Sequence, residues 1–204
     1  MERRALPLER VEFRHDGTGP GKFAGHAAVF KKRAAIGDPK RWGFWEELDP
    51  KAFDRALDEG QDVRLLVDHD PSKLLARTAS GTLELRTDKR GLYTEAELAD
   101  TSVGRDTGVL LKRGDLSQMS FGFTARSDVW ETLKDGSELR RILDVDLFDV
   151  SIVTFPAYPE TDAALRSAID AAGLVNIRRQ RWEAARERFE RMSRPPGAKR
   201  RGEA

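Results

Sequence analysis

The sequence contains no cysteine, and this absence removes several kinds of chemistry at once. Disulfides, cysteine-ligated zinc, iron–sulfur clusters and thiol nucleophiles are all excluded. Only three histidines are present, His15, His26 and His69, so any reaction that depends on an imidazole must use one of them. No apolar run approaches the roughly 18 residues that a membrane-spanning helix needs. The N-terminus also lacks the apolar stretch of a signal peptide, so we expect no membrane association.

Excess positive charge is confined to the C-terminal end of the chain. Residues 178–204 contain ten Lys or Arg against four Glu, a local balance of +6, whereas the whole chain has a net charge of only +1. Such an end is typical of a solvated helix with a frayed terminus, or of a segment that docks to an acidic partner or to nucleic acid. The remainder lacks the evenly basic face and interleaved aromatics of nucleic-acid-binding modules, so we expect no specific nucleic-acid partner.

Alternation of apolar and polar residues predicts a mostly β structure over about the first 160 residues. The expected strands cover residues 11–14, 22–30, 62–67, 74–78, 82–87, 92–98, 117–123, 128–133 and 139–153. One helix is expected to begin at Asp49 and end at Gly60, and another to begin at Asp100 or Thr101 and end at Gly114. Residues 31–42 are expected to form a loop.

A proline-containing segment at residues 155–159 ends the β-rich part. Beyond it, the Ala-rich stretch 162–172 and the Arg/Glu-rich stretch 176–192 predict two helices, and the last residues predict a disordered end. We therefore expect one domain over residues 1–161 and a basic, helical C-terminal extension over residues 162–204.

The most informative motif is Leu-Leu-Val-Asp-His-Asp at residues 65–70, where an apolar strand ends in His69 between two carboxylates. Imidazole is the side chain that exchanges a proton most readily near neutral pH, which makes it the natural general base. The alternative is a polar surface turn. A metal site is less favoured, because Asp68 and Asp70 would point to opposite faces of a continued strand and no second histidine lies at ligand spacing.

A second motif, Gln-Met-Ser-Phe-Gly-Phe at residues 118–123, places Ser120 within an otherwise apolar strand. A nucleophilic serine needs a fixed backbone and a nearby base, and we expect this motif and the His69 motif to lie on adjacent strand ends. Gly122 would let a substrate or another backbone approach closely. The alternative is a core serine whose hydroxyl donates to a neighbouring carbonyl.

Three carboxylates follow one predicted strand in Leu-Asp-Val-Asp-Leu-Phe-Asp-Val-Ser at residues 143–151. Asp144 and Asp146 share one face, whereas Asp149 shares the other with two apolar residues and Ser151. An acid that orients an imidazole is usually held against the core, so Asp149 fits that role better. The alternative is that all three carboxylates face solvent.

Taken in order, these segments resemble the prohead (capsid maturation) serine proteases of tailed phages, whose fold is like that of the herpesvirus assemblins. The resemblance covers roughly residues 10–165. It rests on residues 23–30, 45–53, 67–70, 81–85, 91–92, 118–123 and 146–158. It implies a β-rich α+β fold, namely a closed, mostly antiparallel β-barrel surrounded by helices, that needs no metal or organic cofactor.

The resemblance also assigns roles to residues. In that family the histidine precedes the serine in the chain, so His69 would be the general base and Ser120 the nucleophile. The viral relatives use a second histidine after the serine, which this sequence lacks. Asp149 stands where the family usually has a glutamate and would be the third member. Asp146, Asp144 or a Ser–His dyad are the alternatives.

The function implied by the resemblance is that of a serine endopeptidase of procapsid maturation. Its substrates would be the scaffold-like segment of the major capsid protein and the protease itself, possibly within a homo-oligomer. It would act inside procapsids that assemble in the cytoplasm of the bacterial host. The competing interpretation is a catalytically inactive structural or scaffold-associated capsid assembly protein that keeps the same fold.

Overall fold

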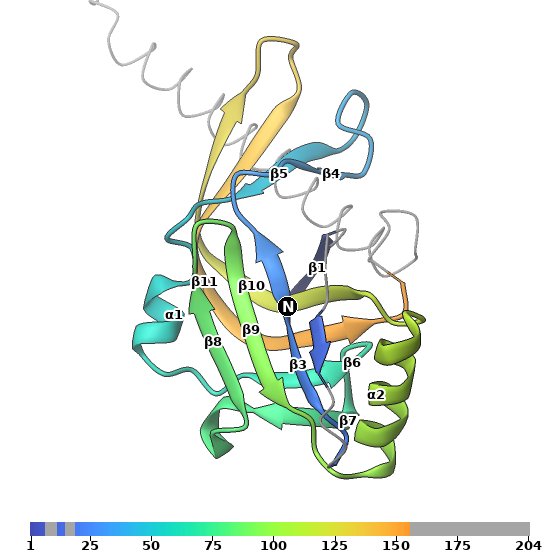
Figure 1. Cartoon of the computed structure of the whole chain (residues 1–204). Helices are drawn as coiled ribbons and strands as arrows, with labels where there is room; N and C mark the ends of the chain where they lie inside the picture. The colour runs from blue at the N-terminus through green and yellow to red at the C-terminus, as the bar shows by residue number, and fades with distance from the viewer. Residues whose placement is uncertain (7–11, 15–18, 156–204) are drawn as a thin grey trace, which may run out of the picture.

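Two β-sheets and three helical segments make up the part of the chain that this computed structural model describes, residues 1–6, 12–14 and 19–155 (Figure 1). The seven-stranded sheet contains β1 (Glu2–Leu6), β4 (Ala34–Ile36), β5 (Phe44–Leu48), β6 (Arg64–Val67), β7 (Asp70–Arg77), β10 (Gln118–Thr132) and β11 (Glu138–Val153). The four-stranded sheet contains β2 (Glu12–Arg14), β3 (Lys22–Val29), β8 (Leu83–Thr87) and β9 (Gly91–Glu97). The helical segments are α1 (Asp54–Asp58), the 3₁₀ turn η1 (Thr78–Ser80) and α2 (Ser102–Arg113).

β11 is the strand that organises the larger sheet. It pairs along its whole length with β10 in an antiparallel hairpin. On its other side, residues 139–142 pair parallel with β5 and residues 149–152 pair parallel with β6. β7 then continues from β6, β4 lies beside β5, and β1 adds to the free side of β10. Consequently β6 and β10 flank the same end of β11.

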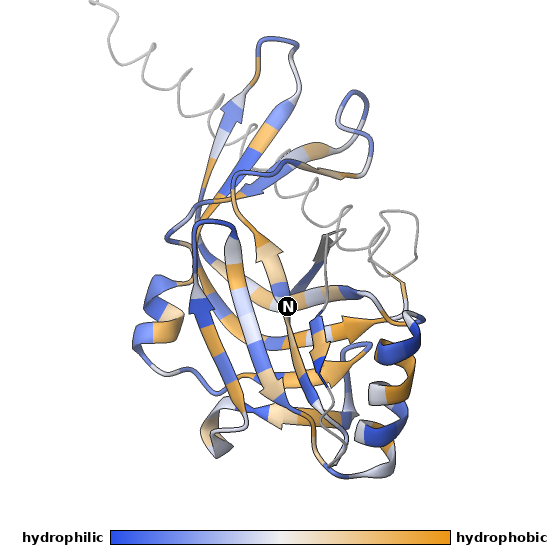
Figure 2. Ribbon diagram, in the orientation of Figure 1, coloured by the Kyte–Doolittle hydropathy of each residue, from blue (hydrophilic) through white to orange (hydrophobic). Residues whose placement is uncertain are grey.

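A single apolar core lies between the two sheets. Its fully buried members include Phe23 and Leu92 from the smaller sheet and Phe121 and Val150 from the larger one. β3 packs across both β10 and β1. Apolar residues recur along the strands of both sheets (Figure 2), and removing them from water is the main force that holds the sheets together.

Most of the predicted secondary structure is confirmed. β8 and β9 form the expected antiparallel hairpin. The Thr101 hydroxyl caps α2 by accepting from the Gly104 N–H at 3.1 Å, and Gly114 ends that helix with a φ of +83°. The first helix begins later than expected, because the Asp49 carboxylate accepts the Lys51 N–H and closes a turn before α1.

Three strands were missed, and the expected barrel is not found. β4 lies within the predicted loop, β5 lies between that loop and the predicted first helix, and β1 precedes the first predicted strand. Among the described residues, the strand ladders form two separate sheets, which pack through side chains and not through a continuous ring of backbone hydrogen bonds. The predicted domain boundary and the helical extension over residues 162–204 lie outside the described residues. No helix in the described part is long and apolar enough to cross a membrane.

Candidate active site

His69 lies in the two-residue turn that joins β6 to β7. Val67 pairs with Asp70 across this turn, and its two central residues, Asp68 and His69, have φ values of +53° and +57°. Positive φ at both central positions is the requirement of a type I′ hairpin turn. Asp and His are among the few residues other than glycine that enter this region readily. The backbone therefore holds the imidazole at the end of β6, where its side chain is only 8% exposed.

The Asp68 carboxylate fastens this turn to the end of β11. The backbone N–H of Thr154 donates to Asp68 Oδ1 at 2.7 Å, and the Thr154 hydroxyl donates to Oδ2 at 3.0 Å. The Asp68 N–H in turn donates to the carbonyl of Ile152 at 2.9 Å. Asp70, on the other side of His69, accepts hydrogen bonds from Ser72. Both carboxylates of the Asp-His-Asp motif therefore support the backbone.

His69 connects a serine hydroxyl to a carboxylate. Its Nε2 lies 2.7 Å from Ser120 Oγ on β10, and its Nδ1 lies 2.5 Å from Asp149 Oδ1 on β11. Ser151 adds a fourth group, because its hydroxyl donates to Asp149 Oδ1 at 2.7 Å and lies 3.2 Å from His69 Nδ1. The sequence predicts that the two motifs lie on adjacent strand ends, but in the structure β11 lies between their strands, β6 and β10. The imidazole reaches Ser120 across β11, which supplies the acid between them.

The structure separates the three candidate acids. Asp149 is 5% exposed and lies beside the imidazole. Asp144 and Asp146 instead bind Arg55 of α1, each at 2.9 Å. The hydrogen bond from Arg55 holds the pKa of Asp146 below its usual range. Asp149 is thus the member of this strand that faces His69.

Gly122 has a different use from the one its sequence suggests. It lies opposite Asp149 in the β10–β11 ladder. A Cβ atom at this position would collide with Asp149 Oδ2. The absent side chain therefore leaves room for the Asp149 carboxylate above β10, not for a substrate or another backbone.

His26, the other histidine that the structure describes, does not contribute to this cluster. His26 lies on β3, where its Nε2 is 2.8 Å from Asp88 Oδ2 and its ring meets the edge of Tyr93. His15 lies outside the described residues. Within the described part of the chain, no group of three or more carboxylates and imidazoles is arranged to hold a metal ion.

The N-terminal strand, which the sequence did not reveal, lies directly against Ser120. β1 pairs antiparallel with β10 so that Ala5 is opposite Ser120. The Ser120 hydroxyl donates to the carbonyl oxygen of Arg4 at 2.9 Å, and Ser120 is only 1% exposed. The stretch around Arg4 is rich in charge and carries no alternating pattern, so it gave no strand signal.

The Arg4 side chain enters a buried ion network. Its guanidinium donates to both carboxylate oxygens of Glu46 on β5. Arg140 of β11 donates to the same carboxylate at 3.0 Å, to Glu2 at 2.7 and 3.0 Å, and to Asp128 at 2.8 Å. Burial would raise the pKa of Glu2, but the hydrogen bonds and charges of Arg140 and Arg4 hold it below its usual range. One sequence signal was available: Glu46 lies two residues from both Phe44 and Leu48, so it shares the buried face of β5 with them.

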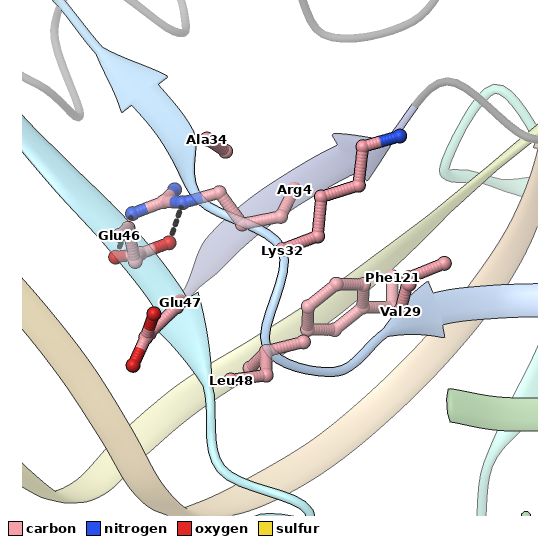
Figure 3. A pocket seen from close by; sticks show the side chains of 8 residues that line it. All are labelled: Arg4, Val29, Lys32, Ala34, Glu46, Glu47, Leu48 and Phe121. Atoms are coloured by element: carbon pink, nitrogen blue, oxygen red, sulfur yellow. Dashed lines mark hydrogen bonds and ion pairs between the residues drawn. The ribbon is translucent and has the colours of Figure 1, made fainter. Parts of the chain in front are cut away.

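A pocket surrounds the Arg4 side chain and contains about 270 Å³ of space, part of it open to solvent (Figure 3). Carboxylates of β5 lie along one wall, and apolar side chains lie below. Its lining residues are Arg4, Val29, Lys32, Ala34, Glu46, Glu47, Leu48 and Phe121. Its lining therefore combines two carboxylates and the cations of Arg4 and Lys32 with apolar side chains.

Comparison with known proteins identifies the family of this chain. A solved structure of the bacteriophage T4 capsid assembly protease is similar to this chain with a TM-score of 0.48 and 8% sequence identity, over 76% of this chain and 97% of that one. No curated protein sequence matches significantly. The sequence profile of the caudovirus prohead serine proteases matches residues 9–173, which is most of the chain and includes the segments that carry His69, Ser120 and Asp149. The chain belongs to the caudovirus prohead serine protease family.

Proposed function

We propose that this protein is a serine endopeptidase in which Ser120 is the nucleophile, His69 the general base and Asp149 the acid that orients it. The observation that carries this proposal is the single imidazole that contacts a serine hydroxyl with one nitrogen and a buried carboxylate with the other. A serine hydroxyl is a weak nucleophile unless an adjacent base accepts its proton, and this arrangement supplies that base. Membership of a serine protease family supports the same assignment.

The proposed reaction begins with attack of Ser120 Oγ on the carbonyl carbon of a peptide bond. The hydroxyl proton passes to His69 Nε2 as the new C–O bond forms. The Nδ1–H of the resulting imidazolium donates to Asp149, which stabilises the added positive charge without taking the proton. The peptide C–N bond then breaks, and His69 returns the proton to the departing amine. The product is an ester between Ser120 and the N-terminal part of the substrate.

Water completes the proposed cycle. His69 accepts a proton from a water molecule while the water oxygen attacks the ester carbonyl carbon. The C–O bond to Ser120 breaks, the proton returns to Ser120 Oγ, and a free carboxylic acid leaves. Ser151 keeps one oxygen of the Asp149 carboxylate hydrogen-bonded throughout, which holds that carboxylate in place.

The substrates proposed for this activity are the scaffold-like segment of the major capsid protein and the protease chain itself. The support is the family, whose members are prohead proteases. Removal of scaffold would free the interior of the particle, so we place the reaction inside procapsids in the host cytoplasm. No residue role in this proposal requires a metal or an organic cofactor.

A fluorophosphonate reagent tests the chemistry directly, because it phosphonylates only serines that a neighbouring base has activated. Ser120 should be labelled, as located by mass spectrometry of the digested protein. Ser120→Ala should abolish labelling, while Ser127→Ala, an exposed serine on the same strand, should leave it unchanged. Co-expression with the major capsid protein should shorten that protein with the unaltered chain and not with Ser120→Ala.

Labelling at other serines, or none in any folded form, would contradict the proposal. It would favour the competing interpretation of an inactive capsid assembly protein. Labelling without cleavage of the capsid protein would keep the chemistry and reject the substrate.

A further inference from the structure

The proposed nucleophile is covered by the chain's own N-terminal strand. Ser120 is 1% exposed, and its hydroxyl lies 2.9 Å from the Arg4 carbonyl oxygen and 2.7 Å from His69 Nε2. A hydroxyl has one proton, so it cannot donate to the carbonyl and to the imidazole at the same time. A separate peptide has no access to this hydroxyl while β1 is in place.

β1 lies where a bound peptide would lie. It is the terminal strand of the larger sheet, and residues 2–6 pair antiparallel with residues 119–123 of β10. Extended peptides commonly bind by adding a strand to a sheet edge, where backbone hydrogen bonds supply affinity and pockets for alternate side chains supply specificity. Without β1, that edge of β10 would be free directly beside Ser120.

Arg4, whose carbonyl contacts Ser120, places its side chain against the buried carboxylate of Glu46. The Arg4 guanidinium binds the carboxylate of Glu46, which is 4% exposed (Figure 3). The apolar side chains of Leu48 and Phe121 lie along the same pocket. Glu46 also has Arg140 as a partner, so the carboxylate would stay paired and in position if β1 left.

The side chain two residues before Arg4, that of Glu2, is also bound by the larger sheet. Glu2 precedes Arg4 by two residues and therefore lies on the same face of β1. Arg140 binds both oxygens of its carboxylate, at 2.7 and 3.0 Å. The same edge therefore offers a cation for an acidic side chain two positions before the basic one.

We propose that the edge of β10 beside Ser120 is the substrate-binding edge, that β1 occupies it as a substrate-like strand, and that the Glu46 pocket accepts Lys or Arg immediately before the scissile bond. This inference rests on the proposed endopeptidase function. The substrate class is an extended peptide with a basic residue before the cleaved bond and an acidic residue two positions earlier. β1 must leave the edge before any other substrate can bind.

Cleavage of synthetic peptides by the full chain tests the pocket. The peptides carry Met-Glu-Arg-X-Ala-Leu, the sequence of residues 1–6, with Arg, Lys, Ala or Glu at X. Cleavage after Arg or Lys should exceed cleavage after Glu by about 100-fold or more in kcat/KM, because a glutamate at X would place its carboxylate against the buried carboxylate of Glu46. Because Glu46 also holds Arg4 and thereby β1, the effect of Glu46→Gln is measured as a ratio: kcat/KM for the Arg or Lys peptide relative to that for the Ala peptide should fall about tenfold or more.

Release of β1 tests the occupied edge. Arg4→Glu places a carboxylate against Glu46 and should expel the strand, raising kcat/KM for the Arg peptide about tenfold or more. Arg3→Glu is the matched control, because Arg3 is exposed and carries the same charge change. It should change the rate less than about twofold. If Arg4→Glu does not fold, Arg4→Ala provides the same comparison.

Two outcomes would overturn this inference alone. One is efficient cleavage with no preference for a basic residue at X, and the other is equal activity of the unaltered chain, Arg4→Glu and Arg3→Glu. The endopeptidase function would then stand. Failure of every folded form to cleave any peptide and to react with a fluorophosphonate would instead reject the proposed function itself, and this inference with it.

Discussion

Two buried polar clusters lie on opposite faces of β10, and they differ in what their charges can do. On one face, Ser120, His69 and Asp149 form a hydrogen-bonded chain. On the other face, the permanently charged Arg4 and Arg140 neutralise buried carboxylates. The first cluster depends on position within a few tenths of an ångström, whereas the second depends on balanced charge. The same strand backbone therefore separates the groups to which we assign the chemistry from the buried ion network.

The largest expected effect lies in the first cluster. Ser120→Ala and His69→Ala should each lower the peptidase rate by about 10⁴-fold to 10⁶-fold, because each removes a group that bonds to or exchanges protons with the substrate. Peptide hydrolysis by the purified protein measures this. Thermal unfolding should change little, since neither change removes a large apolar side chain. Full activity in either folded variant would rule out the assignment.

Substitutions on the two faces of β11 test which carboxylate orients His69. Asp149→Asn should lower the rate by about 10⁴-fold, because an amide can present the wrong hydrogen-bond partner to the imidazole. Asp144→Asn is the matched control on the same strand and should leave the rate nearly unchanged, since Asp144 binds Arg55 and not His69. If the two effects come out reversed, the assignment from strand faces is wrong. Equal, mild effects at both positions would favour a Ser–His dyad.

Substitutions in the second cluster should lower the free energy of unfolding. Arg140→Met leaves the buried carboxylates of Glu46 and Glu2 each with one partner fewer, so it should destabilise the protein by about 3–5 kcal/mol. Arg141→Met is the matched control, because Arg141 is partly exposed and pairs with Glu47 at the surface. It should cost about 1 kcal/mol or less. Denaturant unfolding of the two variants measures the difference.

The sequence predicted the first cluster better than the second. Asp149 could be assigned from strand alternation, because a carboxylate among buried apolar residues stands out against a period of two. The pairing of His69 with Ser120 came from the order of motifs and the family they resemble. The position of β11 between the two strands could not be predicted, because sequence does not reveal which strands become neighbours in a sheet.

The second cluster was missed for a physical reason. A charged stretch at a chain end is normally solvated, and only pairing with β10 buries Arg4. The only local sign of burial was Glu46, a carboxylate on the same strand face as the buried Phe44 and Leu48. Buried ion pairs join residues that are distant in the chain, so no pattern within one strand can reveal the partner.

The turn that carries His69 should give an intermediate effect. Asp68→Ala removes both hydrogen bonds to Thr154 and places a less tolerant residue at positive φ, so it should cost about 1–3 kcal/mol. Because the turn positions the imidazole, the peptidase rate should also fall about tenfold or more. Asp70→Ala is the control, since Asp70 bonds only to nearby Ser72 and Lys73. A loss of stability without a loss of rate would show that the turn does not position His69.

The smallest effect is expected at the carboxylates that the sequence left as alternatives, and it depends on pH. Hydrogen bonding to Arg55 lowers the pKa of Asp146 in the folded protein, so the pair stabilises the fold at neutral pH. This contribution should persist as the pH falls to the ordinary carboxyl pKa of about 4 and disappear below it, as the folded protein binds the proton. The stability difference between the unaltered chain and Asp146→Asn should therefore shrink between roughly pH 5 and pH 2. In an Arg55→Met background that pH dependence should weaken, because the main cause of the lowered pKa is gone. An unchanged pH dependence would assign the lowered pKa of Asp146 to its other partners, Arg126 and Gln61.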